Sequence, residues 1–155
     1  MPFRIAPWLV VACATATGLP LVASANPGVS RANLAMAPVV SLWIAEAPPG
    51  SEVLAAYGRL EGRGRPDTLL AAAVDGVGDV RLHAMTRGPG GGGLMQPLAS
   101  LAVPARGTVN LRPDGVHLML TGLGRRFVAG QTVRMRLTFA RAGLVNVKVS
   151  VRRRN

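Results

Sequence analysis

The sequence predicts an all-β domain, either a β-sandwich or a barrel, from two features of the chain. After residue 26, short apolar runs are separated by Gly, Pro, Asn and Asp, and none continues with the 3.6-residue period of a long helix. Toward the C-terminus, two segments alternate apolar and polar residues, which is typical of strands with one buried face. Many short strands joined by turns are the pattern of sandwiches and barrels.

The strand candidates follow one another between turn signals. An Ala-Pro-Pro-Gly turn at 47–50, a polar loop at 62–67 and an Arg-Pro-Asp-Gly turn at 112–115 separate the apolar runs. A glycine-rich stretch at 88–93 predicts a flexible loop that leads to Met95. The strands before the C-terminal pair are expected at 39–45, 53–60, 69–74, 80–86, 101–103, 108–111 and 116–120.

The last two strands are predicted to form a hairpin. Between 133 and 139, Val, Met, Leu and Phe alternate with Arg and Thr, and between 145 and 151 four valines alternate with Asn, Lys and Ser. The Arg-Ala-Gly sequence at 141–143 supplies the connecting turn. The strands show no internal repeat or boundary, so a single domain is expected over 33–151.

The first 25 residues resemble a secretory signal peptide. Arg4 gives a positive start, 5–21 is mostly apolar, and an Ala-Ser-Ala sequence ends at Ala25. We therefore expect export to the periplasm with cleavage after Ala25, a flexible lead-in at 26–32, and no membrane span in the mature chain. A retained membrane anchor and a lipoprotein attached through Cys13 are the two alternatives.

The chain is strongly basic, with 18 Lys and Arg against 7 Asp and Glu, a formal net charge of +11. The arginines are spread along the chain, apart from a basic tail at 152–155, and aromatic residues for stacking on bases are few. Nucleic acid is therefore not an expected partner, and the charge indicates a solvated surface that helps docking on an acidic partner. An alternative function is an exported basic module that binds an anionic partner and has no metal role.

Enzyme signatures are not found in the sequence. The glycine-rich stretch is not followed by Gly-Lys-Ser/Thr, so it does not form a P-loop. The serines lie in no nucleophile-elbow context, and both histidines belong to the pattern described next. We expect a binding protein and not an enzyme.

Both histidines of the chain lie in predicted strands, each two residues before a methionine. Side chains two residues apart share one face of a strand, so His83 lies beside Met85, and His117 lies beside Met119. The neighbouring aliphatic residues predict that the other face packs on the core. A surface histidine and a gap-filling methionine are the ordinary interpretation of one such pair. Two pairs that use every histidine favour a metal site, opposite the core, where a ligand could reach it.

The residue types indicate which metal this site would prefer. Thioether sulfur is soft and uncharged and imidazole is borderline, and together they suit Cu(I). A zinc site would use Cys or carboxylates, and a calcium site would use several oxygens. The one cysteine, Cys13, lies in the predicted signal peptide, and the seven acidic residues are scattered. Thioethers also suit an oxidising compartment, because they do not form disulfides.

The spacing of these residues resembles that of the periplasmic copper chaperone family of the PCuAC type. His83 is followed twelve positions later by Met95, the segment 96–116 contains 21 residues, and His117-Leu118-Met119 comes next. The early Trp43, the Ala-Pro-Pro-Gly turn and Tyr57 also resemble the family, as do the sequence around 112–120 and the C-terminal hairpin. The resemblance covers roughly residues 33–151.

This resemblance implies a cupredoxin-like, Greek-key β-sandwich that binds one Cu(I) through His83, Met95, His117 and Met119. It also implies delivery of copper to an acceptor, such as an oxidase subunit or assembly factor at the CuA centre of cytochrome c oxidase. Strand geometry by itself nominates Met85, which we keep as the substitute ligand. Members often carry a further methionine after the first histidine or in the loop, where this chain has alanine and glycine.

Overall fold

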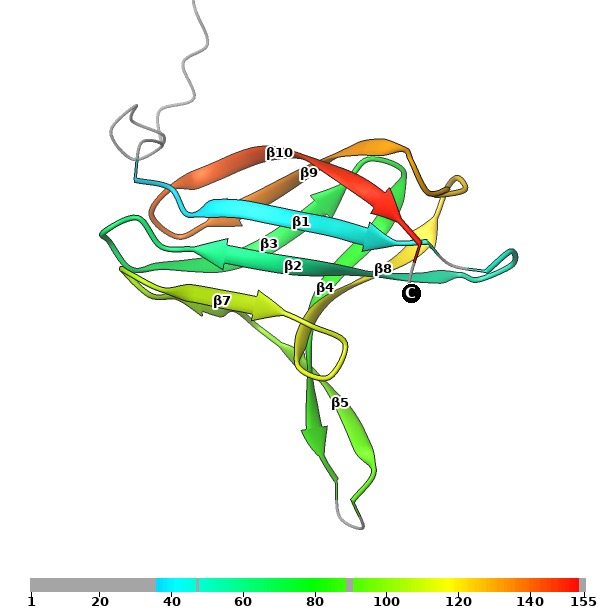
Figure 1. Ribbon diagram of the computed structural model, residues 1–155, viewed down its shortest axis with the longest axis horizontal. Coiled ribbons are helices and arrows are strands. Elements are labelled where there is room, and N and C mark those ends of the chain that lie inside the picture. The colour runs from blue at the N-terminus through cyan, green and yellow to red at the C-terminus, as the bar shows by residue number, and fades with distance from the viewer. Residues whose placement is uncertain (1–35, 47, 89–90, 154–155) are drawn as a thin grey trace, which may run out of the picture.

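The computed structural model describes residues 36–46, 48–88 and 91–153 (Figure 1). The predicted signal peptide, the lead-in at 26–32 and Cys13 lie outside these residues. No helix among the described residues is long and apolar enough to cross a membrane. The described chain forms the strands β1 (Val39–Ala45), β2 (Val53–Glu61), β3 (Asp67–Val74), β4 (Val77–Arg87), β5 (Gly93–Leu98), β6 (Leu101–Val103), β7 (Thr108–Leu111), β8 (Val116–Leu123), β9 (Thr132–Phe139) and β10 (Gly143–Arg152).

The ten strands form one hydrogen-bonded sheet that folds over on itself (Figure 1). The strand order is β5-β4-β8-β2-β1-β10-β9-β3-β6, and β7 pairs with the second half of β2. Strands β1 and β10 run parallel, whereas their other neighbours are antiparallel. The predicted all-β sandwich is confirmed, and one half of the sheet, β4-β8-β2-β1, faces the other half, β10-β9-β3.

The core lies between these two halves. The alternation predicted for the C-terminal hairpin is confirmed, because the apolar residues of β9 are buried and its arginines are exposed. Facing them from the other half are apolar residues of β1, β2, β4 and β8. The fully buried side chains of the core include Ile44, Leu60, Leu69, Leu111, Leu118, Leu120, Met135, Leu137 and Phe139.

One strand of the structure, β5, was not predicted from the sequence. Strand β5 begins at Gly93, so Met95 belongs to a strand and not to a flexible loop. Pairing with β4 supplies the hydrogen bonds that outweigh the low strand propensity of the glycines. Strand β5 lies at an edge of the sheet, where Pro97 is tolerated because no further strand needs its missing N–H. The hairpin of β4 and β5 extends beyond the two layers (Figure 1).

A buried carboxylate stabilises one end of the sandwich. Asp67, at the start of β3, is 7% exposed. Its side chain accepts hydrogen bonds from the backbone N–H groups of Thr68 (2.7 Å), Arg141 (2.9 Å) and Ala142 (3.0 Å). The last two residues lie in the turn between β9 and β10, so Asp67 ties that turn to β3.

Replacing Asp67 with alanine should lower the free energy of unfolding by about 3 kcal/mol, because three backbone N–H groups, of which that of Ala142 is buried, lose a charged acceptor. Urea unfolding of the protein measures this change. The matched control is Asp79→Ala, since the carboxylate of Asp79 pairs with Arg81 at 2.6 Å but is about half exposed. An exposed pair of this kind should contribute less than about 1 kcal/mol. Equal losses in the two variants would contradict this role of Asp67.

Candidate metal site

The register of three neighbouring strands collects the five predicted donors on one face of the sheet. His83 of β4 is paired directly with His117 of β8. Met85 of β4 is paired with Met95 of β5, and directly paired residues point to the same face. Met119, two residues after His117, shares that face as well. All five predicted donors therefore lie on the face opposite Leu82 and Leu118, which are buried in the core.

The two imidazole rings are close enough to bind one ion. Their centroids lie 6.2 Å apart, and their planes meet at 72°. With a metal–nitrogen bond of about 2.0 Å and a ring radius of about 1.2 Å, two rings on one ion have centroids at most about 6.4 Å apart. The observed separation falls within this limit, so the distance between the two rings is compatible with a single ion bound by both.

The ring of His117 is held by the carbonyl of Gly115. The Nδ1 atom of His117 lies 3.2 Å from that oxygen, and the backbone N–H of Met85 donates to the same oxygen at 3.1 Å. A carbonyl oxygen only accepts, so the hydrogen of the neutral ring is on Nδ1 and the lone pair is on Nε2. This arrangement is typical of metal-binding histidines, whose second nitrogen is fixed by an outer hydrogen bond.

His83 has a buried nitrogen without a partner. Its Nδ1 atom is shielded from solvent and makes no hydrogen bond to any described residue. An unsatisfied buried polar atom costs about 1–3 kcal/mol, so such atoms are uncommon in folded proteins. Coordination to a metal ion would satisfy an imidazole of this kind. The unpartnered nitrogen of His83 therefore fits a metal site formed by these soft donors.

The histidines are less accessible than the sequence predicted. His83 and His117 are 7% and 5% exposed, whereas a site open to ligands was expected opposite the core. A row of aromatic rings on this face contributes to their burial. The ring centroid of Tyr57 lies 6.2 Å from that of His117, and the ring centroid of Trp43 lies 5.3 Å from that of Tyr57. Neither Tyr57 nor the carbonyl of Gly115 could be assigned a role from the sequence; the only signals were the Tyr57 position in the family pattern and the turn at 112–115.

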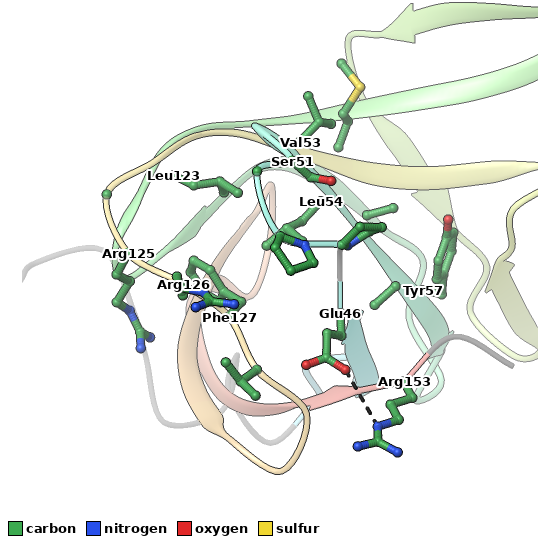
Figure 2. Close-up of a pocket in the computed structure, with 18 of the residues that line it drawn as sticks. Glu46, Ser51, Val53, Leu54, Tyr57, Leu123, Arg125, Arg126, Phe127 and Arg153 are labelled. Atoms are coloured by element: carbon green, nitrogen blue, oxygen red, sulfur yellow. Dashed lines mark ion pairs between the residues drawn. The ribbon is translucent and has the colours of Figure 1, made fainter.

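The methionines form the open side of the candidate site. Met95 is 46% exposed, and together with Met119 it lines a groove of about 1210 Å³. Tyr57 lines the same groove (Figure 2). The Met85 side chain points in another direction, toward the tip of the hairpin. Its terminal methyl carbon occupies the space beside Gly93 and would lie only 2.7 Å from a Cβ atom added to that glycine. Met95 and not Met85 faces the groove that contains Met119.

The environment of His83 lowers its pKa from the ordinary 6.5, first through burial and then through the positive charges of His117 and Arg81. The unfolded chain keeps the ordinary pKa and binds a proton first as the pH falls. The apo-protein should therefore lose stability as the pH falls below about 6.5. The loss should end below the lowered pKa of His83, because the folded protein then binds the proton as well. Urea unfolding near pH 7.5 and near pH 5 measures the loss. The variant His83→Leu should lack this part of the pH dependence, and an unchanged dependence would contradict the assignment.

The fold is that of the PCuAC domains. The copper-bound PCuAC domain from PmoF2 superposes with a TM-score of 0.61 at 20% identity, over 73% of this chain and 89% of that domain. The apo form of DR1885 from Deinococcus radiodurans gives a TM-score of 0.60 at 29% identity, over 99% of this chain and 95% of that one. The Cu(I) form of DR1885 gives a TM-score of 0.57 at 32% identity, over 73% and 76%. The predicted cupredoxin-like sandwich and the resemblance to the PCuAC type are confirmed.

The sequence itself places the chain in a family. Residues 38–151 match the family described as "Putative lipoprotein LpqE-like", and the protein belongs to this LpqE-like family. A relative from Leifsonia xyli subsp. xyli, described as "Putative lipoprotein Lxx21020", is 28% identical over 115 residues, which are 74% of this chain and 68% of the relative.

Proposed function

We propose that this protein is an exported copper carrier that binds one Cu(I) through His83, His117, Met119 and Met95. The single observation that carries the proposal is the register of β5, β4 and β8, which brings both histidines and three methionines to one face. The copper-bound forms of PmoF2 and DR1885 support it, since the chain shares their fold. We expect the protein to be a carrier and not an enzyme.

The chemistry of these donors suits a carrier that must also release its cargo. Imidazole and thioether are neutral ligands, so no thiolate has to be reprotonated when copper leaves. The partly exposed Met95 lets the ligands of an acceptor approach while the buried histidines still hold the ion. We propose that the acceptor is a copper-requiring protein outside the cytosol, such as the CuA subunit of cytochrome c oxidase or its assembly factor.

Export is proposed from the N-terminal segment, with cleavage after Ala25 as the first expectation. The family and the Leifsonia relative carry the word lipoprotein in their descriptions, which favours the alternative of attachment through Cys13. The intact mass of the protein recovered from cells distinguishes the two. Cleavage after Ala25 gives an unmodified chain that begins at Asn26, whereas attachment gives a lipidated Cys13.

Anaerobic titration of the protein with Cu(I) against a competing chelator tests the copper function. One equivalent of Cu(I) should bind tightly, and X-ray absorption should detect both nitrogen and sulfur neighbours of the metal. A spectrum with only nitrogen and oxygen neighbours would exclude the proposed ligands. Failure to compete with the chelator would favour the alternative of a basic module that binds an anionic partner without metal.

A further inference from the structure

A groove that contains the exposed methionine of the candidate site continues well beyond that site. Its walls are the turn between β1 and β2 and the segment that follows β8 (Figure 2). Leu54 and Phe127 lie buried in its wall, and Val53 and Val128 are 46% and 42% exposed. The groove therefore presents apolar side chains to solvent next to Met95.

Positive charge surrounds these apolar side chains. Arg125, Arg126 and Arg153 line the groove, and Glu46 is the single carboxylate among its described lining residues (Figure 2). Glu46 is already engaged, because it lies 3.9 Å from Arg153 and accepts a hydrogen bond from the backbone N–H of Ala129 at 3.0 Å. Among the described residues no carboxylate lies within 4.0 Å of the guanidinium nitrogens of Arg125 or Arg126.

One of these arginines is held in place over the apolar wall. The guanidinium of Arg125 lies 4.6 Å from the ring centroid of Phe127, and it donates to the backbone carbonyl of Asp75 at 3.5 Å. A cation over an aromatic face is attracted by the ring and keeps part of its polar edge free. The groove thus combines an apolar wall with fixed positive charge, and its complement is an apolar segment that carries carboxylates.

We propose that this groove docks an acidic, apolar segment of the copper-accepting protein. The proposal rests on the proposed copper function for the identity of the partner, because Met95 and Met119 line the same groove and a docked segment would lie beside the metal. A second copy of this chain is a poor occupant, since both copies carry a net charge of +11 and would repel each other.

The test uses the apo-protein, so that it does not depend on copper. The probe is a short synthetic peptide in which aspartates alternate with leucines, and the control peptide carries lysines in place of the aspartates. NMR titration of the isotope-labelled protein should give shifts at residues of the groove with the acidic peptide and none with the basic one. Shifts spread evenly over the arginine-bearing surface, or no shifts, would overturn the proposal.

The double variant Arg125→Glu/Arg126→Glu should weaken binding of the acidic peptide by about tenfold or more, since it reverses the charge of the rim. The matched control is Arg63→Glu/Arg106→Glu, which changes the net charge equally at exposed positions outside the groove. Equal weakening in both variants would indicate unspecific attraction and would overturn the proposal.

Vesicles provide the remaining arm of the test. If anionic phospholipid vesicles bind in a manner that depends on Arg125 and Arg126, and the acidic peptide does not bind, the groove recognises a membrane and the proposal is wrong. Copper function is judged separately by the Cu(I) titration. If the protein does not bind Cu(I) but the acidic peptide still binds in the groove, the docking site is supported. Only the assignment of a copper acceptor as its partner would then be wrong.

Discussion

Replacing His83 with leucine should abolish tight Cu(I) binding and leave the apo-protein at least as stable as before. Loss of an outer-shell partner of a metal site costs 10–100-fold in affinity, so loss of a direct ligand should cost about a hundredfold or more. The stability of the apo-protein, in contrast, should rise. The Nδ1 atom of His83 is buried without a hydrogen-bond partner among the described residues, and leucine removes that atom. We expect a gain of about 1 kcal/mol near neutral pH.

The matched variant is His117→Leu, which removes the other imidazole from the same face. It should lose Cu(I) affinity to a similar extent but should also destabilise the apo-protein by about 1 kcal/mol, because the hydrogen bond to the Gly115 carbonyl is lost. Competition with a Cu(I) chelator and urea unfolding of the apo-proteins measure the two effects. A His83→Leu variant that keeps its copper affinity and loses several kcal/mol of stability would identify His83 as an ordinary core histidine.

Most of the fold could be predicted from the sequence because the strand pattern is local. The alternation in the C-terminal hairpin requires one buried face, and β9 has its apolar residues in the core. Strand β5 as a whole was missed for a physical reason. Glycines at 91–93 favour a loop by propensity, and the ladder with β4 that makes Gly93 part of a strand depends on pairing.

The candidate site could be predicted only in part. Alternation along each strand correctly placed His83 with Met85, and His117 with Met119, but it could not show that β4 and β8 are neighbours. The pairing of residues more than thirty positions apart depends on how the whole sheet folds, and only the family-like spacing pointed to it. Burial of the histidines was missed because it depends on neighbouring strands, including the ring of Tyr57 on β2.

The second large effect on Cu(I) affinity is expected at one of the two methionines of the β4–β5 hairpin. Both residues lie on the same face, since they are directly paired, so the register does not separate them. Their side chains do, because Met95 lines the groove with Met119 while the terminal methyl of Met85 lies over Gly93. Since β5 already holds Met95 in a ladder, copper binding should need less ordering of the chain than a ligand on a free loop would.

Met95→Leu should therefore reduce Cu(I) affinity by about a hundredfold, as loss of a direct ligand does, and leave the fold intact because leucine keeps the volume. Met85→Leu is the matched control, with the same exchange on the paired residue, and should change the affinity by less than about threefold. Chelator competition measures both, and X-ray absorption should detect one sulfur neighbour fewer in Met95→Leu alone. If Met85→Leu is the more damaging change, Met85 turns from the hairpin tip to the metal, and the ligand set is His83, Met85, His117 and Met119.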